Sequence, residues 1–280
     1  MSDKTSPSNQ PATPRRKVKR PVHIGAVNWV GLNALYVREV ERFIKIALQT
    51  LIAPMITSVL FLMVFSVAIG ERATFVGDLD FVTFLIPGLV MMSVLQNAFA
   101  NTSSSLVISK VQGNIVDLLM PPLGPGALLL GLAAAGMPRG LFVGLVTAAA
   151  LMLIGGITMP TNLWTVLLFL VLGSFAMSFA GILAGIWANK FDELASITNF
   201  LIQPLTFLSG TFYSIDRLPS PFDAIAGFNP VFYMIDGFRY GMIGVADRPL
   251  TTGVICLLTV NLTLAILCYR ALDSGYRLKS

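Results

Sequence analysis

The chain alternates long runs of apolar residues with short polar segments. Six runs approach the twenty residues that a helix needs to cross about 30 Å of hydrocarbon. They lie at about 48–69, 82–104, 136–156, 163–187, 195–213 and 251–270. The pattern predicts an all-α membrane protein with a six-helix transmembrane domain over residues 48–270.

Residues 28–47 have the 3.6-residue period of an amphipathic helix instead. Their apolar face holds Trp29, Leu32, Tyr36, Val40, Phe43 and Ala47, and the opposite face holds Arg38, Glu41, Arg42 and Lys45. We expect an interfacial helix that lies flat on the bilayer, where aromatic rings and cations suit the headgroup level. Packing against a soluble partner is compatible with this interpretation.

The charges indicate the orientation. Residues 1–27 are rich in Ser, Pro, Lys and Arg and should form a disordered basic cytoplasmic tail, and residues 271–280 a second cytoplasmic tail. In a soluble protein the basic cluster 15–20 would suit nucleic acid, but beside a membrane span it marks the cytoplasmic side, so we expect no nucleic-acid partner. The other cations agree: Lys110, Lys190, Arg270, Arg277 and Lys279 fall in expected inside segments, and only Arg72, Arg217, Arg239 and Arg248 outside.

The composition excludes most enzyme classes. Only 12% of the 280 residues are charged and 55% are hydrophobic, whereas a soluble domain has roughly 25% charged residues. The single histidine, His23, lies in the polar tail, and the sequence has no phosphate-binding loop and no zinc or nucleophile motif. We therefore expect no catalytic residue, metal or cofactor in this chain.

Two expected spans carry polar side chains on one narrow face. These residues are Ser93, Gln96, Asn97, Asn101 and Ser104 in the second span, and Asn199, Gln203 and Thr206 in the fifth. Such side chains avoid lipid and either bond across helices or line a watery path. Packing alone explains them about as well as a path.

Arg139 and three glycines bear on how the helices pack. A guanidinium near the bilayer centre is costly, so Arg139 is expected at the cytoplasmic boundary, with a buried ion pair as the alternative. Gly173, Gly181 and Gly185 in the fourth span allow close helix approach. They could serve movement or be static contacts.

The segment 108–122 joins spans two and three inside the cell. Its mixed polarity predicts a short surface helix, ended by the Pro and Gly residues of 121–126. Val111, Ile115, Leu118 and Leu119 could anchor it in a groove of a partner protein. An ordinary connector is the alternative.

The last outside segment, 214–250, is long and apolar. Asn229 and Pro230 predict a helix start with Asn as cap and Pro at the first position. Tyr233 follows within that helix, and Asp236 and Arg239 are spaced to pair. We expect short re-entrant helices in the outer leaflet between spans five and six, in preference to a small globular cap.

These features together resemble the permeases of ABC-2 type exporters. The resemblance rests on the flat first helix, the surface helix, and the stretches 208–219 and 229–239, and it covers nearly all of residues 28–280. The runs 101–105 and 112–122 look like the subset near polysaccharide, nodulation-factor and drug exporters. The resemblance implies a lipid-linked, polysaccharide or amphipathic drug-like cargo, and the bacterial inner membrane as the location.

The resemblance also implies roles for the segments. The chain would form a homodimer, contact membrane lipid and bind a separate ATPase subunit that carries ATP and magnesium. The helix 28–47 would be the connecting helix and the stripes would line the path. The coupling helix would use Lys110, Gln112, Asn114, Ile115, Asp117, Leu118, Pro121 and Pro122, and the outer gate would use Asn229, Pro230, Tyr233, Asp236 and Arg239.

Two other classes remain open on the residues alone. An ion-coupled secondary transporter would usually carry charges at mid-membrane, where only Arg139 is available. An intramembrane lipid-modifying enzyme would need paired carboxylates or a nucleophile with its base, and Asp236 with Arg239 is too little for that.

Overall fold

The computed structural model describes residues 28–69, 74–76, 79–119, 123–156, 159–219 and 221–277. The expected tail 1–27, the last three residues of the expected tail 271–280, and Pro121 and Pro122 lie outside this part. Within it, five helices are long and apolar enough to cross a membrane. They are α2 (Ala47–Ile69), α3 (Phe81–Val111), α5 (Pro125–Gly155), α6 (Leu163–Trp187) and α11 (Leu250–Ser274).

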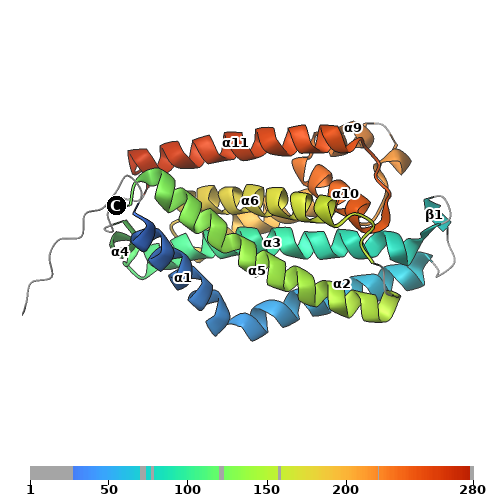
Figure 1. Cartoon of the computed structure of the whole chain (residues 1–280), viewed down its shortest axis with the longest axis horizontal. Helices are drawn as coiled ribbons and strands as arrows, with labels where there is room; N and C mark the ends of the chain where they lie inside the picture. The colour runs from blue at the N-terminus through green and yellow to red at the C-terminus, as the bar shows by residue number, and fades with distance from the viewer. Residues whose placement is uncertain are drawn as a thin grey trace, which may run out of the picture.

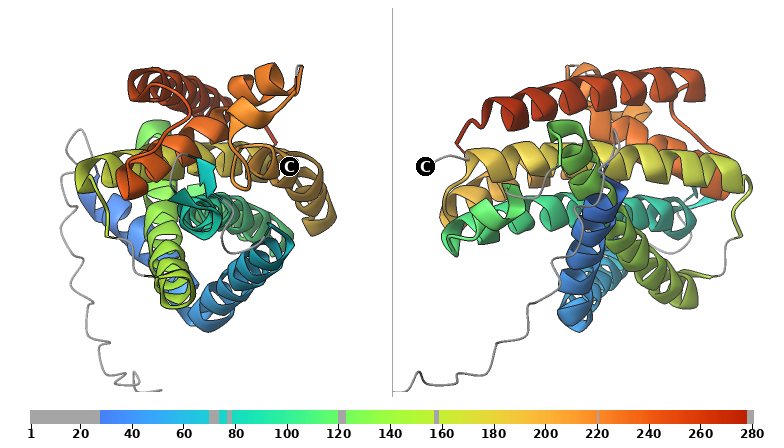
Figure 2. Two further views of the ribbon diagram at one scale, coloured as in Figure 1. Left: turned by 90° about the vertical axis from the view of Figure 1, so that its right-hand side faces the viewer. Right: turned by 60° about the vertical axis from the view of Figure 1, so that its left-hand side comes forward.

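The five long helices form a bundle with α3 and α6 at its centre (Figure 1). In its most apolar window α3 is 83% buried, whereas α2 and α11 are each 11% buried. Figure 2 shows these two helices at opposite margins of the bundle. The hydrophobic core therefore lies around α3, and the outer faces of α2 and α11 are left for lipid or another chain.

Close approach of α3 and α6 depends on glycine. A Cβ at Gly181 would overlap the Thr102 hydroxyl and lie 2.5 Å from the Phe99 carbonyl oxygen, and one at Gly185 would lie 3.0 Å from the Ser103 carbonyl oxygen. Real Cβ atoms essentially never lie as close as at Gly181, and at Gly185 a Cβ would also lie 2.8 Å from Leu106 Cβ, so larger residues would push the helices apart. The glycines of the fourth span thus make packing contacts in this conformation.

Helix α5 is longer than the span expected at 136–156, because Pro125 occupies a first-turn position, where proline is tolerated. Its 31 residues would extend about 46 Å, more than the hydrocarbon thickness. Figure 1 shows that α5 runs obliquely across α3 and α6. Tilt accommodates the excess length.

The fifth expected span is interrupted, so the prediction of one continuous helix over 195–213 is corrected. Helix α7 (Phe191–Ile197) leads into a π-helical turn, η1 (Thr198–Ile202), and then α8 (Gln203–Phe207). The Gln203 N–H donates five residues back to Thr198, and Pro204 has no N–H to donate. The helical run from Phe191 to Phe207 is about 25 Å long, and six crossings stay a prediction.

Helix α1 (Trp29–Lys45) begins at Asn28, whose side chain accepts the Gly31 N–H. It packs along α5, and its buried residues are Leu35, Glu39 and Phe43. Arg42, expected on the solvent face, turns toward α3 instead, because Asn101 and Ser104 offer it hydrogen-bond acceptors. Whether α1 lies flat on a membrane stays a prediction.

The two ends of the bundle differ. Figure 1 places α4 (Ile115–Leu119) and the C-terminus at one end. The other end carries a short antiparallel pair of strands, β1 (Thr74–Val76) and β2 (Leu79–Asp80), near η2 (Ile215–Arg217), α9 (Phe222–Phe228) and α10 (Pro230–Ile243). Segments expected inside and outside the cell therefore gather at opposite ends.

Candidate coupling surface, polar stripes and outer cluster

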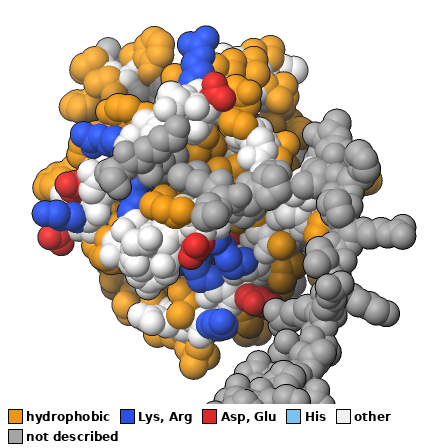
Figure 3. Space-filling model, turned by 90° about the vertical axis from the view of Figure 1, so that its left-hand side faces the viewer, with side chains coloured by type: hydrophobic (Ala, Val, Ile, Leu, Met, Phe, Trp, Pro, Cys, Tyr) orange, Lys and Arg blue, Asp and Glu red, His pale blue; other side chains and the backbone are white. Residues whose placement is uncertain are grey.

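The short helix α4 stands at the end of α3 with one side free. A turn over residues 112–114, with Gly113 at φ +73°, reverses the chain after α3. Gln112, Asn114, Val116 and Asp117 are exposed, and Ile115 is partly buried. Figure 3 shows this end of the molecule, where charged side chains gather within an apolar margin. A partner protein could therefore reach the outward face of α4.

Two details of this segment differ from the prediction. The α3 helix continues to Val111, so the separate surface helix is only Ile115–Leu119. Leu118, expected as an anchor for a partner, is 3% exposed and packs with Leu35, Ile186 and Leu272 of its own chain. Its apolar side is better buried against these neighbours than left in water.

Lys110 also points inward rather than to a partner. Its ammonium lies 2.5 Å from the Ile186 carbonyl oxygen, 3.1 Å from that of Ala188 and 3.4 Å from the Asn189 side-chain oxygen. These acceptors lie at and just after the end of α6. Lys110 therefore faces the end of α6 and is not part of the outward surface of the coupling segment.

The stripe on α3 bonds mainly to neighbouring helices. Ser93 lies 3.1 Å from Ser58 of α2, oxygen to oxygen, and the Asn101 amide donates to the Ala135 carbonyl of α5 at 3.1 Å. Asn97 donates to the Ser93 carbonyl of its own helix at 3.0 Å. In this conformation Ser93 links α3 to α2 and Asn101 links α3 to α5.

The two stripes meet at one contact. The Gln96 amide donates to the Thr206 hydroxyl at 3.2 Å and so joins α3 to α8. Asn199 and Gln203 of the second stripe are exposed, on the side that also shows Phe200, 83% exposed. The fifth-span segment therefore presents amides and apolar side chains outward, which only a second chain or lipid can cover.

Arg139 lies beside the middle of α3, and its place at the cytoplasmic boundary of the membrane stays a prediction. Its guanidinium reaches the Asn97 side-chain oxygen at 3.4 Å, and its Nε has no hydrogen-bond partner. Among the described residues no carboxylate lies within 4 Å of it, so the alternative of a buried ion pair is not observed. The Asn97 side-chain oxygen accepts from Arg139 near the middle of α3. The position of Arg139 in the sequence did not indicate this contact.

Glu39 is a buried acid that the sequence reading missed. It is 1% exposed and accepts from Arg42 Nε at 3.1 Å. Arg42 continues to the Asn101 carbonyl at 2.8 Å and to the Ser104 hydroxyl at 3.2 Å. The three-residue spacing of Glu39 and Arg42 was the one sequence signal for this pair. Through Arg42 the pair joins α1 to the stripe on α3.

At the other end, α10 begins where the sequence predicts. The Asn229 side chain accepts the Val231 N–H at 3.0 Å and donates to the Leu205 carbonyl at 2.7 Å, and Pro230 occupies the first turn. The Tyr233 hydroxyl donates to the Gly227 carbonyl at 2.9 Å. These bonds fix α10 to α8 and α9.

Asp236 and Arg239 form the centre of an outer cluster. Arg239 is fully buried, with Nη1 3.9 Å from the Asp236 carboxylate and Nη2 2.5 Å from the Gly210 carbonyl oxygen. Its guanidinium carbon lies 3.9 Å from the centre of the Phe84 ring on α3. The sequence predicted the pair of Asp236 and Arg239. The fold brings the other two neighbours of Arg239 close, Phe84 on α3 and Gly210 in the 208–214 loop.

The loop after α10 completes the outer cluster. The Asp236 carboxylate accepts the backbone N–H groups of Asp247 and Arg248 at 2.9 and 3.1 Å. Asp247 in turn accepts from Ser214 and the Ile215 N–H at 2.9 and 2.8 Å.

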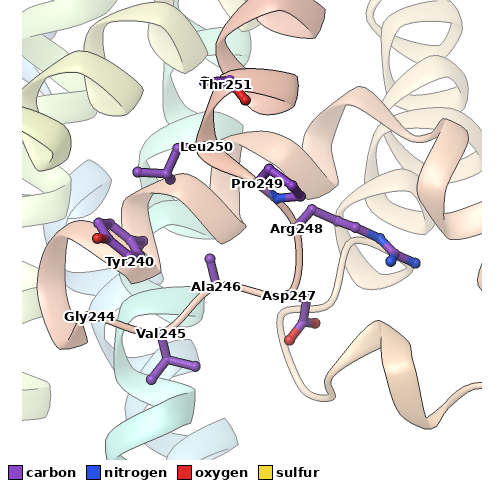
Figure 4. A pocket seen from close by; sticks show the side chains of 9 residues that line it. All are labelled: Tyr240, Gly244, Val245, Ala246, Asp247, Arg248, Pro249, Leu250 and Thr251. Atoms are coloured by element: carbon purple, nitrogen blue, oxygen red, sulfur yellow. The ribbon is translucent and has the colours of Figure 1, made fainter.

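Two hollows border this end. One, about 700 Å³, is lined by Tyr240 and residues 244–251. Figure 4 shows it around the loop from α10 to α11, with Asp247 and Arg248 pointing in different directions. The other, about 480 Å³, is almost wholly apolar and lies among Leu205, Phe222, Ile225 and Pro230.

The chain is similar to a family of transporters over most of its length. The family described as ABC-2 type transporter matches residues 31–243. Inner membrane transport permease YadH of Escherichia coli strain K12 is 38% identical over 254 residues, covering 90% of this chain and 98% of the relative. Nodulation protein J of Rhizobium leguminosarum bv. trifolii is 27% identical over 243 residues, covering 84% and 90%. The similarity thus spans nearly all of each chain.

Proposed function

The chain belongs to the ABC-2 type transporter family and is a transmembrane subunit of an ABC transporter, and on this premise we propose that it is an exporter permease driven by a separate ATPase. It is a multi-pass protein of the inner membrane and a transport subunit rather than an enzyme. ATP and magnesium would bind to the partner subunit.

The observation that carries this proposal is α4. It is a single turn of helix between two long apolar helices, placed at the charged end of the bundle with Gln112, Asn114 and Asp117 exposed. A soluble ATPase can grip such a helix without entering the membrane. Closure of two ATPase subunits around ATP would displace α4 and bias the bundle between two packings.

The path would lie against the stripes and a second copy of the chain. Asn199 and Gln203 are exposed on the interrupted segment, and Gln96 ties that segment to α3 through Thr206. In a homodimer these amides would face a shared polar interior. A π-helical turn is a feature that often accompanies function, which supports movement at residues 198–202.

The cargo would be a lipid-linked, polysaccharide or amphipathic drug-like molecule moved out of the cytoplasm. The apolar hollow among Leu205, Phe222 and Ile225 could receive an acyl or aromatic group near the outer end. Residues 215–243 would be re-entrant and form the outer gate. The bonds of Asn229, Tyr233, Asp236 and Arg239 would hold that gate as one unit.

The test is to express the chain with the ABC ATPase encoded beside it and to purify the complex in lipid discs. We expect the two to copurify and the complex to hydrolyse ATP, while the permease alone does not. Replacing Asp117 by Pro should break α4 and uncouple hydrolysis from export, with the long helices still inserted. Hydrolysis by the chain alone, or failure to associate, would refute the proposal.

A matched control keeps this test specific. Asp192 lies in the first turn of α7 at the same end of the bundle and is also exposed. Asp117 also lies in the first turn of its helix, but its N–H donates to the Asn114 carbonyl at 3.1 Å, and proline deletes that bond. The first N–H groups of α7 have no partner within that helix, so Asp192→Pro should leave coupling unchanged. If both proline variants uncouple, α4 has no special role.

A further inference from the structure

Three consecutive backbone carbonyls at the end of α6 are held by cations from two other elements. Lys110, at the end of α3, reaches the carbonyl oxygens of Ile186 and Ala188 at 2.5 and 3.1 Å. Arg277, just after α11, donates to the Trp187 carbonyl between them at 2.7 Å. We call Lys110, Arg277 and these carbonyls the α6-end clamp.

The clamp is favourable for a general reason. The last carbonyls of a helix have no partners within the helix, and the helix dipole makes that end negative. Cationic side chains there make charge-assisted hydrogen bonds, which are stronger than neutral ones. The guanidinium of Arg277 also lies 5.4 Å from the centre of the Trp187 ring. Three elements thus converge on one helix end.

The clamp joins two segments that the proposed function requires to move. Lys110 lies directly before the turn that leads into α4. The chain after α6 turns at Asn189, whose N–H donates to the Glu193 carboxylate at 2.8 Å, and enters α7. Lys110 therefore ties the base of α4 to the end of α6, and the chain continues from that end into α7.

We propose that Lys110 and Arg277 are positioning residues that pass the ATP-driven displacement of α4 to α6 and α7. This rests on the proposed function, because the displacement must come from an ATPase bound at α4. Within the described residues, α4 is also attached by the buried side of Ile115 and Leu118, which packs into an apolar cluster shared with α1, α3, α5, α6 and α11. Apolar side chains can slide past one another. The charge-assisted hydrogen bonds of the α6-end clamp instead hold the base of α4 at one position on α6.

The experiment measures distances within one copy by spin labelling, in lipid discs with the ATPase bound. Labels at Val116→Cys and Leu130→Cys report α4 against α5, and labels at Ala195→Cys and Leu130→Cys report α7 against α5. All three positions are exposed. Cys256 and Cys268 are replaced by alanine, and labelled chains are diluted with unlabelled ones.

Each pair is read without nucleotide and with ATP and vanadate. In the parent protein we expect both distances to change. In Lys110→Met the α4 distance should still change, while the change in the α7 distance should fall about twofold or more. Lys110→Arg keeps a cation with several donors and should restore it. Arg277→Gln should act like Lys110→Met, and Lys190→Met, an exposed cation nearby, should have no effect.

The outcomes separate this proposal from the proposed function. If the ATPase does not copurify with the unlabelled parent protein, the proposed function fails. If it does, and the α7 distance changes in Lys110→Met as in the parent, the clamp is only a static helix cap and the proposal is overturned. A parent protein in which α4 moves and α7 does not overturns it as well.

Discussion

Two arginines in the bundle show opposite ways of placing a guanidinium among apolar helices. Arg239 has a carboxylate, a carbonyl and an aromatic ring around it and is fully buried. Arg139 has one hydrogen bond, at 3.4 Å to an amide oxygen, and no carboxylate within 4 Å among the described residues; the Nε atoms of both arginines have no hydrogen-bond partner. The outer cluster is therefore built to stay in one arrangement, whereas the surroundings of Arg139 fix no single one.

The largest expected effect comes from breaking the outer pair. Arg239→Met leaves the Asp236 carboxylate buried without its counter-charge, which should cost about 3–5 kcal/mol of unfolding free energy. The thermal unfolding midpoint in detergent measures this. The double variant with Asp236→Asn should lose less than Arg239→Met alone, and a larger loss would mean that the pair is not what holds the cluster.

A smaller loss is expected when α3 is moved away from the 208–214 loop. A Cβ at Gly88 would lie 2.7 Å from the Thr211 carbonyl oxygen and 3.2 Å from Arg239 Nη2. Gly88→Ala should therefore cost about 1–3 kcal/mol by overpacking. Gly227→Ala, where nothing lies within 4 Å, is the control, and equal melting shifts for the two would contradict the close contact.

Removal of the α10 cap should have a still smaller effect. Asn229→Ala deletes the bond to the Val231 N–H, and loss of such a cap typically costs about 1 kcal/mol. The lost bond to the Leu205 carbonyl adds to it. Asn229→Asp keeps the cap and should recover most of the melting temperature. If it does not, the bond to Leu205 matters more.

The smallest effect is expected at Arg139. Arg139→Met removes a charge that has no carboxylate to leave behind, so the unfolding free energy should change by less than about 1 kcal/mol. The thermal unfolding midpoint in detergent is measured for Arg139→Met and for Arg239→Met, and the two losses are compared. A loss as large as that of Arg239→Met would end the distinction between the two arginines.

Sequence patterns predicted the long helices well and the direction of single polar side chains poorly. The spans expected at 48–69 and 163–187 match α2 and α6 almost to the residue, because apolar run length is a local property. The start of α10 at Asn229 and Pro230 was equally local. The π-helical turn at residues 198–202 was not predicted. Pro204 within an apolar run does not show whether the turn before it is α-helical or the wider π-helical kind.

The polar side chains depend on contacts far along the chain. Glu39 is buried because Arg42 carries it against α3, and Lys110 turns inward because α6 ends beside it. Arg42 is only three residues from Glu39, but its acceptors on α3 and the carbonyls at the end of α6 lie far along the chain, so the sequence did not reveal these contacts. The roles of the coupling, path and gate residues stay predictions for the same reason.

The glycine contacts between α6 and α3 limit how this protein can change shape. With backbone against backbone at Gly181 and Gly185 there is no spare volume for one helix to slip past the other, so the pair must travel as a rigid body. Conformational freedom has to be sought where side chains are loosely covered, along the margins formed by α2 and α11. A conducting state should therefore keep the contact between α3 and α6 and differ in how this pair lies against α2, α11 and the segment from α7 to α8.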